Sequence, residues 1–340
     1  MDFWLGYASF LMKTLTVVVA IVIVLVTLAG LRMRGRERGQ GQMQVHKLNE
    51  CYEGYKEALE EEILEPKALK ALRKRQAKEQ KKLEKNPVEK PRVYVLDFDG
   101  DIKASAVETL RHEITALLSV ARVDDEVVVR LESGGGMVHS YGLAASQLAR
   151  IRDAGVPLTI CVDKVAASGG YMMACIGSQI ISAPFAILGS IGVVAQVPNV
   201  HRLLKKNDVD VEVLTAGEYK RTLTVLGENT EKGREKFKED LEITHKLFKD
   251  FVAKHRPQLD IEKVATGETW LGTAALELNL VDSLKTSDQY LYERAANADV
   301  FALTYQVRKS LPEKMGLAAS AAVERSLVKG WTKLSQRIWH

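Results

Sequence analysis

An uncharged run of 18 residues near the N-terminus constrains this chain more than any other feature. Thr14–Leu31 is dense in Val, Ile and Leu on all sides, which disfavours a buried core element. It is followed by four arginines, Arg32, Arg34, Arg36 and Arg38. A helix of 18 residues reaches about 27 Å, enough to cross the hydrocarbon core of a bilayer. No small-x-small cleavage site follows, so a cleaved signal peptide is disfavoured. We predict an N-terminal segment 1–31 with a transmembrane helix over about 10–31.

The basic excess of the chain lies in the segment that follows, residues 32–92. This segment holds 17 Lys/Arg and 11 Asp/Glu, whereas the whole chain has a net charge of only +4. Glu50–Glu65 is acidic, Lys67–Lys85 is basic, and sparse apolar residues recur at helical spacing. We therefore predict a charged helical stalk that folds back on itself. No aromatic residues interleave the basic ones, so nucleic acid is not a predicted partner.

Strands that alternate with helices indicate an α/β domain over residues 93–300. Apolar runs at Val93–Phe98, Glu126–Leu131 and Leu158–Val162 predict buried strands joined by helical crossovers, and hence a parallel sheet. Ser105 and Glu108 have the spacing of a capping box that opens the first helix. Later segments predict helices, three of which cover 231–255, 272–278 and 287–297. The remaining residues, 301–340, predict a short strand and an amphipathic helix.

A second uncharged stretch, Val165–Val200, could be mistaken for another membrane span. Glycines and prolines interrupt it throughout, and a bilayer would leave such a broken backbone without hydrogen-bond partners. We interpret it as the deep core of the α/β domain, with uncharged turns that line a site.

The cysteines indicate neither a disulfide framework nor a metal site. The chain has three, Cys51, Cys161 and Cys175, and no Cys-x-x-Cys or Cys/His spacing typical of zinc. We predict no metal and no cofactor.

Two glycine-rich turns follow two of the predicted strands. The first is Ser133–Gly136 and the second is Ala167–Gly170. In an open parallel sheet the turns at the carboxyl ends of the strands form the site. Glycines there allow backbone N–H groups to approach a ligand, and a pair of such groups can stabilise an oxyanion. Ser168 lies between a strand and a helix-like run, a position suited to a nucleophile.

A nucleophilic serine requires a base, and the sequence offers two candidates. His139 follows the first glycine turn, although a residue at a helix N-terminus is exposed more often than catalytic. Lys220 follows a predicted strand at Val211–Thr215 and could act if burial kept it neutral. Its neighbour Arg221 keeps its proton and cannot serve. The residues alone leave this choice open.

The motifs taken together resemble the signal peptide peptidase A family of membrane serine peptidases, on its SohB branch. The resemblance rests on KVAASGGYMMA, GSIGVV, AGEYKRTLT and ATGETWLG, and on the transmembrane start, the charged spacer and the ESGGG turn. It implies a ClpP/crotonase-type fold, a parallel βαβ spiral, and assembly into a homo-oligomeric ring. The chain departs from the family at Gly134, where the family's first turn usually has proline.

The resemblance also implies a role for each site residue. Ser168 would be the nucleophile and Lys220 the general base. Ser190 would orient the lysine, and Gly135 and Gly169 would supply the oxyanion hole. The triad of ClpP needs a histidine about 25 residues after the serine, and this chain has none there. A Ser–Lys dyad is therefore favoured.

These observations predict a membrane-anchored serine endopeptidase of a bacterial inner membrane, which hydrolyses extended apolar peptides such as signal-peptide remnants. The arginines after the span favour a cytoplasmic catalytic domain, whereas the resemblance implies the opposite side. A lysine keeps its proton in neutral water, so activity is expected to rise with pH. Two other functions stay open: a crotonase-like acyl-CoA enzyme and a non-catalytic oligomeric scaffold.

Overall fold

The computed structural model describes residues 41–85 and 89–306. The predicted transmembrane helix and the predicted C-terminal amphipathic helix lie outside these ranges. Among the helices within them, none has the length and apolar character needed to span a membrane. Residues Met43–Tyr305 form one compact unit, which contains every predicted site residue.

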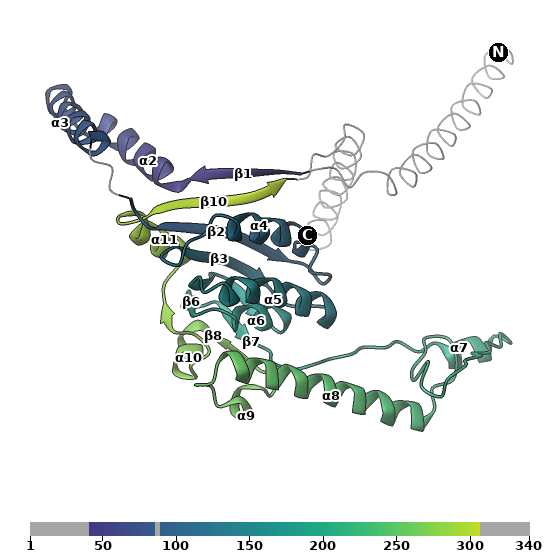
Figure 1. Ribbon diagram of the computed structural model, residues 1–340. Helices are drawn as coiled ribbons and strands as arrows, with labels where there is room; N and C mark the ends of the chain where they lie inside the picture. The colour runs from purple at the N-terminus through teal and green to yellow at the C-terminus, as the bar shows by residue number, and fades with distance from the viewer. Residues whose placement is uncertain (1–40, 86–88, 307–340) are drawn as a thin grey trace, which may run out of the picture. The chain divides into compact units, whose positions relative to one another are not determined.

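A largely parallel sheet organises this unit (Figure 1). The strands of its main path are, in spatial order, β1 (Gln42–Lys47), β10 (Asp299–Gln306), β2 (Arg92–Gly100), β3 (Glu126–Ser133), β4 (Leu158–Val162), β6 (Gln179–Ser182) and β9 (Ser283–Leu284). A branch leaves this path at β3 and contains β5 (Val165–Ala167), β7 (Ile187–Gly189) and β8 (Thr269–Leu271). The pairs from β10 to β9 along the path are parallel, as are β3–β5 and β5–β7, and β7–β8 is antiparallel. The predicted α/β class with parallel strands is confirmed.

Helices connect the strands, and several of them pack on the sheet. They are α2 (Leu48–Ile63), α3 (Pro66–Lys85), α4 (Val107–Leu118), α5 (Val138–Asp153), α6 (Gly169–Ala174), α7 (His201–Lys206), α8 (Glu231–His255), α9 (Ile261–Val264), α10 (Gly272–Glu277) and α11 (Ser287–Ala295). The sequence places the long helix α8 at the same bounds. The helices predicted at 272–278 and 287–297 end one and two residues earlier, at Glu277 and Ala295, within the usual uncertainty of helix termini. The first helix of the domain, expected to reach about Arg122, ends four residues earlier at Leu118.

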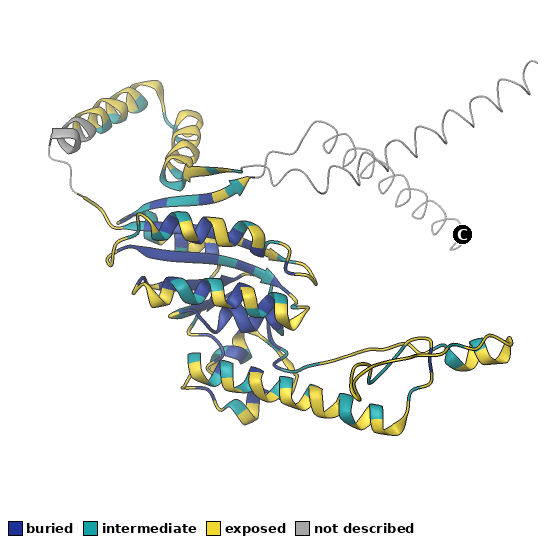
Figure 2. Cartoon of the chain, turned by 45° about the vertical axis from the view of Figure 1, so that its right-hand side comes forward, coloured by how far each residue is buried: buried dark blue, intermediate teal, exposed yellow. Residues whose placement is uncertain are grey.

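The sheet is buried on both faces, which explains its nearly continuous apolar strands. Alternate residues of β2 enter two separate clusters. Tyr94 and Leu96 pack into the larger one under α4 and α5, and Val93 and Val95 pack with Leu291 of α11. Figure 2 shows the dark blue of buried residues concentrated in the strands and in the inner sides of these helices.

The predicted capping box at the start of α4 is wrong. The Ser105 hydroxyl donates to Asp101 Oδ2 at 2.8 Å, and α4 begins later, at Val107. The carboxylate of Asp101 also accepts the backbone N–H groups of Ser105 and Lys103, and these hydrogen bonds hold the pKa of Asp101 below its ordinary value. The preceding turn therefore captures the serine that the helix would otherwise use.

The uncharged stretch is core only in its first part. Most residues from Ala166 to Ile191 are buried, as predicted, but Val194–Asn199 is exposed. After Gly192 the chain leaves the sheet and forms α7, and it returns to the sheet along α8. We call residues 193–230 the excursion; it lies at the end of α8 that is distant from α6 (Figures 1 and 2).

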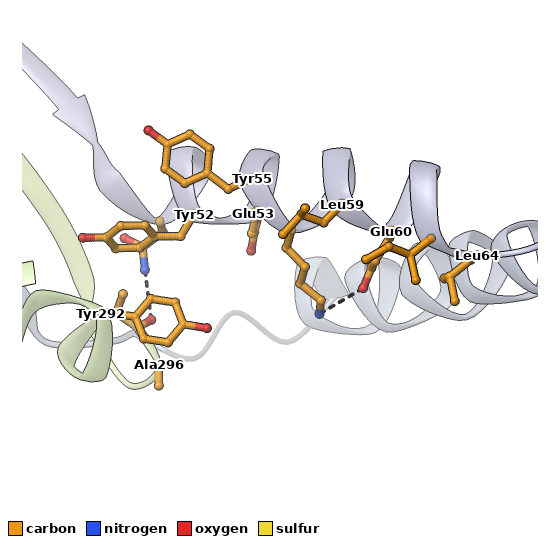
Figure 3. Close-up of a pocket in the computed structure, with 12 residues that line it drawn as sticks. Tyr52, Glu53, Tyr55, Leu59, Glu60, Leu64, Tyr292 and Ala296 are labelled. Atoms are coloured by element: carbon orange, nitrogen blue, oxygen red, sulfur yellow. Dashed lines mark hydrogen bonds and ion pairs between the residues drawn. The ribbon is translucent and has the colours of Figure 1, made fainter. Parts of the chain in front are cut away.

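Within the charged segment, α2 and α3 are helical, whereas Gln42–Lys47 forms strand β1. Arg73 of α3 pairs with Glu61 of α2. The first turn of α2 is not free in solvent. Asn49 donates from Nδ2 to the carbonyls of Ala295 and Ala298, each at 3.0 Å. Beyond that turn, a groove of about 630 Å³ separates α2 from α11 (Figure 3). It is lined chiefly by Tyr52, Tyr55, Leu59, Ile63 and Tyr292, and it contains no predicted site residue.

Candidate active site

Strand pairing brings three turns together at one edge of the branch. Ser133 at the end of β3 pairs with Ala166 of β5, and Ala167 of β5 pairs with Gly189 of β7. The residues that follow these strand ends are the first glycine turn, Ser168 and Ser190. The N–H of Ser168 donates to the carbonyl of Gly189 at 2.8 Å, which ties the last two turns directly.

The first glycine turn packs against the Ser168 turn without room for a side chain. A β-carbon placed on Gly135 would lie 2.6 Å from Gly169 N and 2.7 Å from Ser168 Cβ. Gly135 also has φ +89°, a backbone conformation that L-residues rarely adopt. Close approach and backbone conformation together therefore require glycine at this position. The predicted oxyanion residues Gly135 and Gly169 are thus in contact with each other and with Ser168.

Ser168 itself has a strained backbone. Its φ of 53° and ψ of −120° lie outside the regions that non-glycine residues normally adopt. Such strain costs on the order of 1–3 kcal/mol and persists where the surrounding structure enforces it, often at a functional site. The residue stands between β5 and α6, and it is half-buried. A sharp strand-to-helix turn of this kind is how several hydrolases expose a nucleophile.

A buried hydrogen-bond chain supports the first glycine turn. The N–H of Gly135 donates to Ser133 Oγ at 3.1 Å, and Ser133 Oγ lies 2.5 Å from the hydroxyl of Tyr141. That hydroxyl donates to the carbonyl of Asp101 at 2.7 Å. Burial raises the pKa of Tyr141, so the phenol keeps its proton. The sequence reasoning missed Tyr141, because a tyrosine in a helix after a glycine turn carries no signal of its own.

An apolar groove of about 350 Å³ opens beside Ser168. Its side chains come mainly from α5, α6 and α8 and include Val138, Met172, Leu247, Phe248 and Phe251, with Ser168 and Gly169 at its edge. A groove of this size and composition can accept an apolar side chain next to the serine hydroxyl. Sequence reasoning did not identify its wall on α8, since α8 reaches the site only through tertiary packing.

Ser190 lies in the turn after β7, next to the Ser168 turn. It has φ 51°, and its N–H donates to the carbonyl of Glu268 at 2.6 Å. Ile191 follows it, and the carbonyl of Ile191 accepts a hydrogen bond from His245 Nε2 of α8 at 3.2 Å. The structure therefore places Ser190 in the cluster with Ser168, Gly135 and Gly169.

Lys220 is the predicted site residue that a single chain does not bring into this cluster. It is exposed, it lies in the excursion between α7 and α8, and it does not line the groove beside Ser168. The strand predicted at Val211–Thr215 does not form, because none of the strands in the described part of the chain lies beside this segment, which is largely exposed. The role of Lys220 as the general base therefore remains a prediction.

Neither His139 nor either buried cysteine lies where it could act as a base or a nucleophile. His139 is exposed in the first turn of α5 and does not line the groove. Burial raises the pKa of Cys161 to about 12 and also raises that of Cys175, so neither thiol ionises readily. Within 41–85 and 89–306, no cluster of three or more His, Cys, Asp or Glu side chains could hold a metal ion.

Comparison with known proteins identifies the family of this site. The model of the peptidase family S49 N-terminal region matches residues 2–148, and the peptidase family S49 model matches residues 150–300. The chain belongs to peptidase family S49. Its relatives in this family include a probable protease SohB of Haemophilus influenzae, 59% identical over 72% of this chain and 69% of that protein. A probable protease SohB of Buchnera aphidicola is 52% identical over 71% of each chain.

Membership of family S49, on its SohB branch, makes this chain a protease and favours peptide substrates. It disfavours the acyl-CoA enzyme and the non-catalytic scaffold. Among solved structures, a mutant of the 1510-N membrane-bound stomatin-specific protease matches 63% of this chain and 98% of its own, with 14% identity and a TM-score of 0.41.

Proposed function

We propose that this S49 protease is a membrane-anchored serine endopeptidase with Ser168 as nucleophile and Lys220 as general base. The strained turn that presents Ser168 against Gly135, at the edge of an apolar groove, is the observation that carries the proposal. Lys220 would take the Ser168 hydroxyl proton and later return it to the leaving amine, held in place by Ser190.

The oxyanion of the tetrahedral intermediate would accept two backbone hydrogen bonds. Gly169 is the first residue of α6, so its N–H has no acceptor within the helix. The N–H of Gly135 donates to Ser133 Oγ in the free protein and would be shared with the oxyanion as a three-centre bond. Each such donor is worth about 3–4 kcal/mol of transition-state stabilisation.

Lys220 would reach the serine of a neighbouring copy in a homo-oligomeric ring. Two observations support this arrangement. The excursion that carries Lys220 lies away from α6 of its own chain (Figure 1). The same excursion exposes large apolar side chains, among them Val194 at 92% and Leu214 at 88%, which association with a second copy would bury.

The substrates would be extended, mainly apolar peptides such as signal-peptide remnants. The groove beside Ser168 is lined by apolar side chains, and the uncharged Thr14–Leu31 run would hold the enzyme where such peptides are left. We propose a bacterial inner membrane as the site of the anchor, because the named relatives come from bacteria.

Reaction of the full-length chain with a fluorophosphonate probe tests the nucleophile and the base. We expect mass spectrometry to find the label on Ser168 in the wild type, and no label in Ser168→Ala. Lys220→Ala should slow labelling by about 10²-fold or more, as loss of a positioned general base does. Labelling that continues at the wild-type rate in Lys220→Ala would exclude Lys220 as the base.

Mixing the two inactive variants tests where the lysine comes from. If Lys220 acts on Ser168 of a neighbouring copy, co-assembled Ser168→Ala and Lys220→Ala chains contain some sites with both residues intact. Peptidase activity should then reappear in the mixture. A mixture that stays inactive, although co-assembly is shown by two different affinity tags, would contradict a shared site.

The pH profile of peptide hydrolysis follows from a lysine base. Only the neutral amine can accept the serine proton, so kcat/KM is expected to rise from pH 6 towards pH 10. The stability of the fold should be recorded over the same range to exclude unfolding as the cause. A flat profile would count against lysine and in favour of another base.

A further inference from the structure

Three strand ends meet at the side chain of Tyr141, which is fully buried. A β-carbon placed on Gly169, the second residue after β5, would lie 2.4 Å from Tyr141 Cγ, so the ring packs directly against that turn. The hydroxyl lies 2.5 Å from Ser133 Oγ at the end of β3. It also donates to the carbonyl of Asp101, directly after β2, at 2.7 Å.

The shortest hydrogen bonds around Tyr141 favour one direction of the chain. The Tyr141 hydroxyl donates to the carbonyl of Asp101 at 2.7 Å, and a carbonyl can only accept. Ser133 Oγ accepts from the N–H of Gly135 and donates to the tyrosine oxygen at 2.5 Å, in preference to the carbonyl of Gly100 at 3.4 Å. Hydrogen bonds in such a buried chain strengthen one another. The orientation of the Gly135 peptide is therefore coupled to a side chain that also supports Gly169.

We propose that Tyr141 is a positioning residue that sets the spacing of the two oxyanion donors. Its ring packs against Gly169 and so fixes the position of that turn. Its hydroxyl, through Ser133, fixes the orientation of the Gly135 peptide. Tyr141 does not line the groove beside Ser168, so it acts through the two glycines. The inference rests on the proposed function, because it assigns Gly135 and Gly169 to the oxyanion of a peptide hydrolysis.

The chain provides a matched control for the loss of a buried tyrosine hydroxyl. Tyr171 is also fully buried, and its hydroxyl donates to the carbonyl of Leu280 at 2.9 Å, outside the hydrogen-bond chain that joins Asp101, Ser133 and Gly135. Tyr141→Phe and Tyr171→Phe therefore each remove one hydroxyl from the core and keep the ring. A general loss of stability should affect the two variants alike, whereas a change in the oxyanion site should appear only in the first.

The experiment compares both variants with the wild type as full-length chains. Removal of an oxyanion donor lowers kcat by about 10²–10³-fold. Tyr141→Phe leaves the Gly135 N–H in place but less well oriented, so we expect a smaller fall in kcat, of about tenfold or more. KM should change less than twofold. A peptide aldehyde forms an oxyanion when Ser168 adds to it, so its affinity should fall in parallel with kcat. The matching peptide alcohol forms no oxyanion, and its affinity should not change. Tyr171→Phe should match the wild type in kcat and in both affinities.

Equal kcat values in the two variants, or a fall that appears in KM alone, would overturn the inference and leave the proposed function intact. If Tyr141→Phe does not fold, Ser133→Ala breaks the same chain at its next link with a smaller change, and the same expectations apply. A wild-type chain that neither hydrolyses peptides nor labels at Ser168 would overturn both the inference and the proposed function.

Discussion

Replacing Gly135 by alanine is expected to abolish peptidase activity, with a loss of at least about 10²–10³-fold in kcat. The new methyl group would lie 2.6 Å from Gly169 N, 2.7 Å from Ser168 Cβ and 2.8 Å from the carbonyl of Ala167. All three belong to the turn that presents the nucleophile, so the two turns must separate. The positive φ of Gly135 adds backbone strain that alanine tolerates poorly. The rate of fluorophosphonate labelling at Ser168 measures the loss.

The neighbouring glycine is the control for this substitution. A β-carbon on Gly134 would meet no atom within 4 Å, and the backbone of Gly134 does not have a positive φ. Gly134→Ala should therefore label at close to the wild-type rate. The same free space can accommodate the proline that the family usually has at this position. If Gly134→Ala and Gly135→Ala lose activity equally, close packing of the two turns is not the cause.

Removing Asp282 is expected to lower the free energy of unfolding by about 2 kcal/mol, less than the loss of a partner in a fully buried ion pair, because the Asp282 side chain is 32% exposed. The guanidinium of Arg256 is 3% exposed and donates two hydrogen bonds to the Asp282 carboxylate, at 2.8 and 2.9 Å. The same carboxylate accepts the N–H of Ile180 at 2.7 Å. Asp282→Ala would leave a buried positive charge and a buried N–H without their acceptor. Urea denaturation measures the effect.

A surface ion pair nearby in sequence is the control. Lys285 and Glu293 lie 2.5 Å apart, but both side chains are more than a third exposed. Glu293→Ala should cost less than about 1 kcal/mol, because water screens exposed pairs. Arg256 follows the last turn of α8, and α8 forms one wall of the groove beside Ser168. A loss of stability in Asp282→Ala that is no larger than in Glu293→Ala would show that this pair does not hold α8 in place.

Much of the fold could be predicted from local patterns. Apolar runs long enough for buried strands, separated by helical periodicity, indicated the parallel sheet and located α8 correctly. The failures have local physical causes. Ser105 bonds to Asp101 in place of the helix, and Val211–Thr215 has a strand-like composition but no neighbouring strand. Composition predicts the tendency of a segment, whereas a strand forms only where a partner supplies hydrogen bonds.

The candidate site, too, could be predicted only in part from the sequence. Glycine turns and a serine between small residues are recognisable in sequence, because close approach of the backbone requires glycine. The contacts among Gly135, Ser168 and Ser190 depend on strands β3, β5 and β7 lying side by side. Tyr141 could not be recognised at all, because its importance comes from the two turns that it touches.

The residues that could carry the chemistry are recognisable from the order of the amino acids alone: a serine after a short strand, glycines that free the backbone, and one lysine in a recognisable motif. Which of them meet depends on the fold. Strand pairing joins Ser168, Ser190 and the glycine turns across more than thirty residues of chain, because backbone hydrogen bonds fix the register of the strands. The same structure leaves Lys220 on an exposed excursion, because nothing apolar within residues 41–85 and 89–306 holds that segment against the sheet.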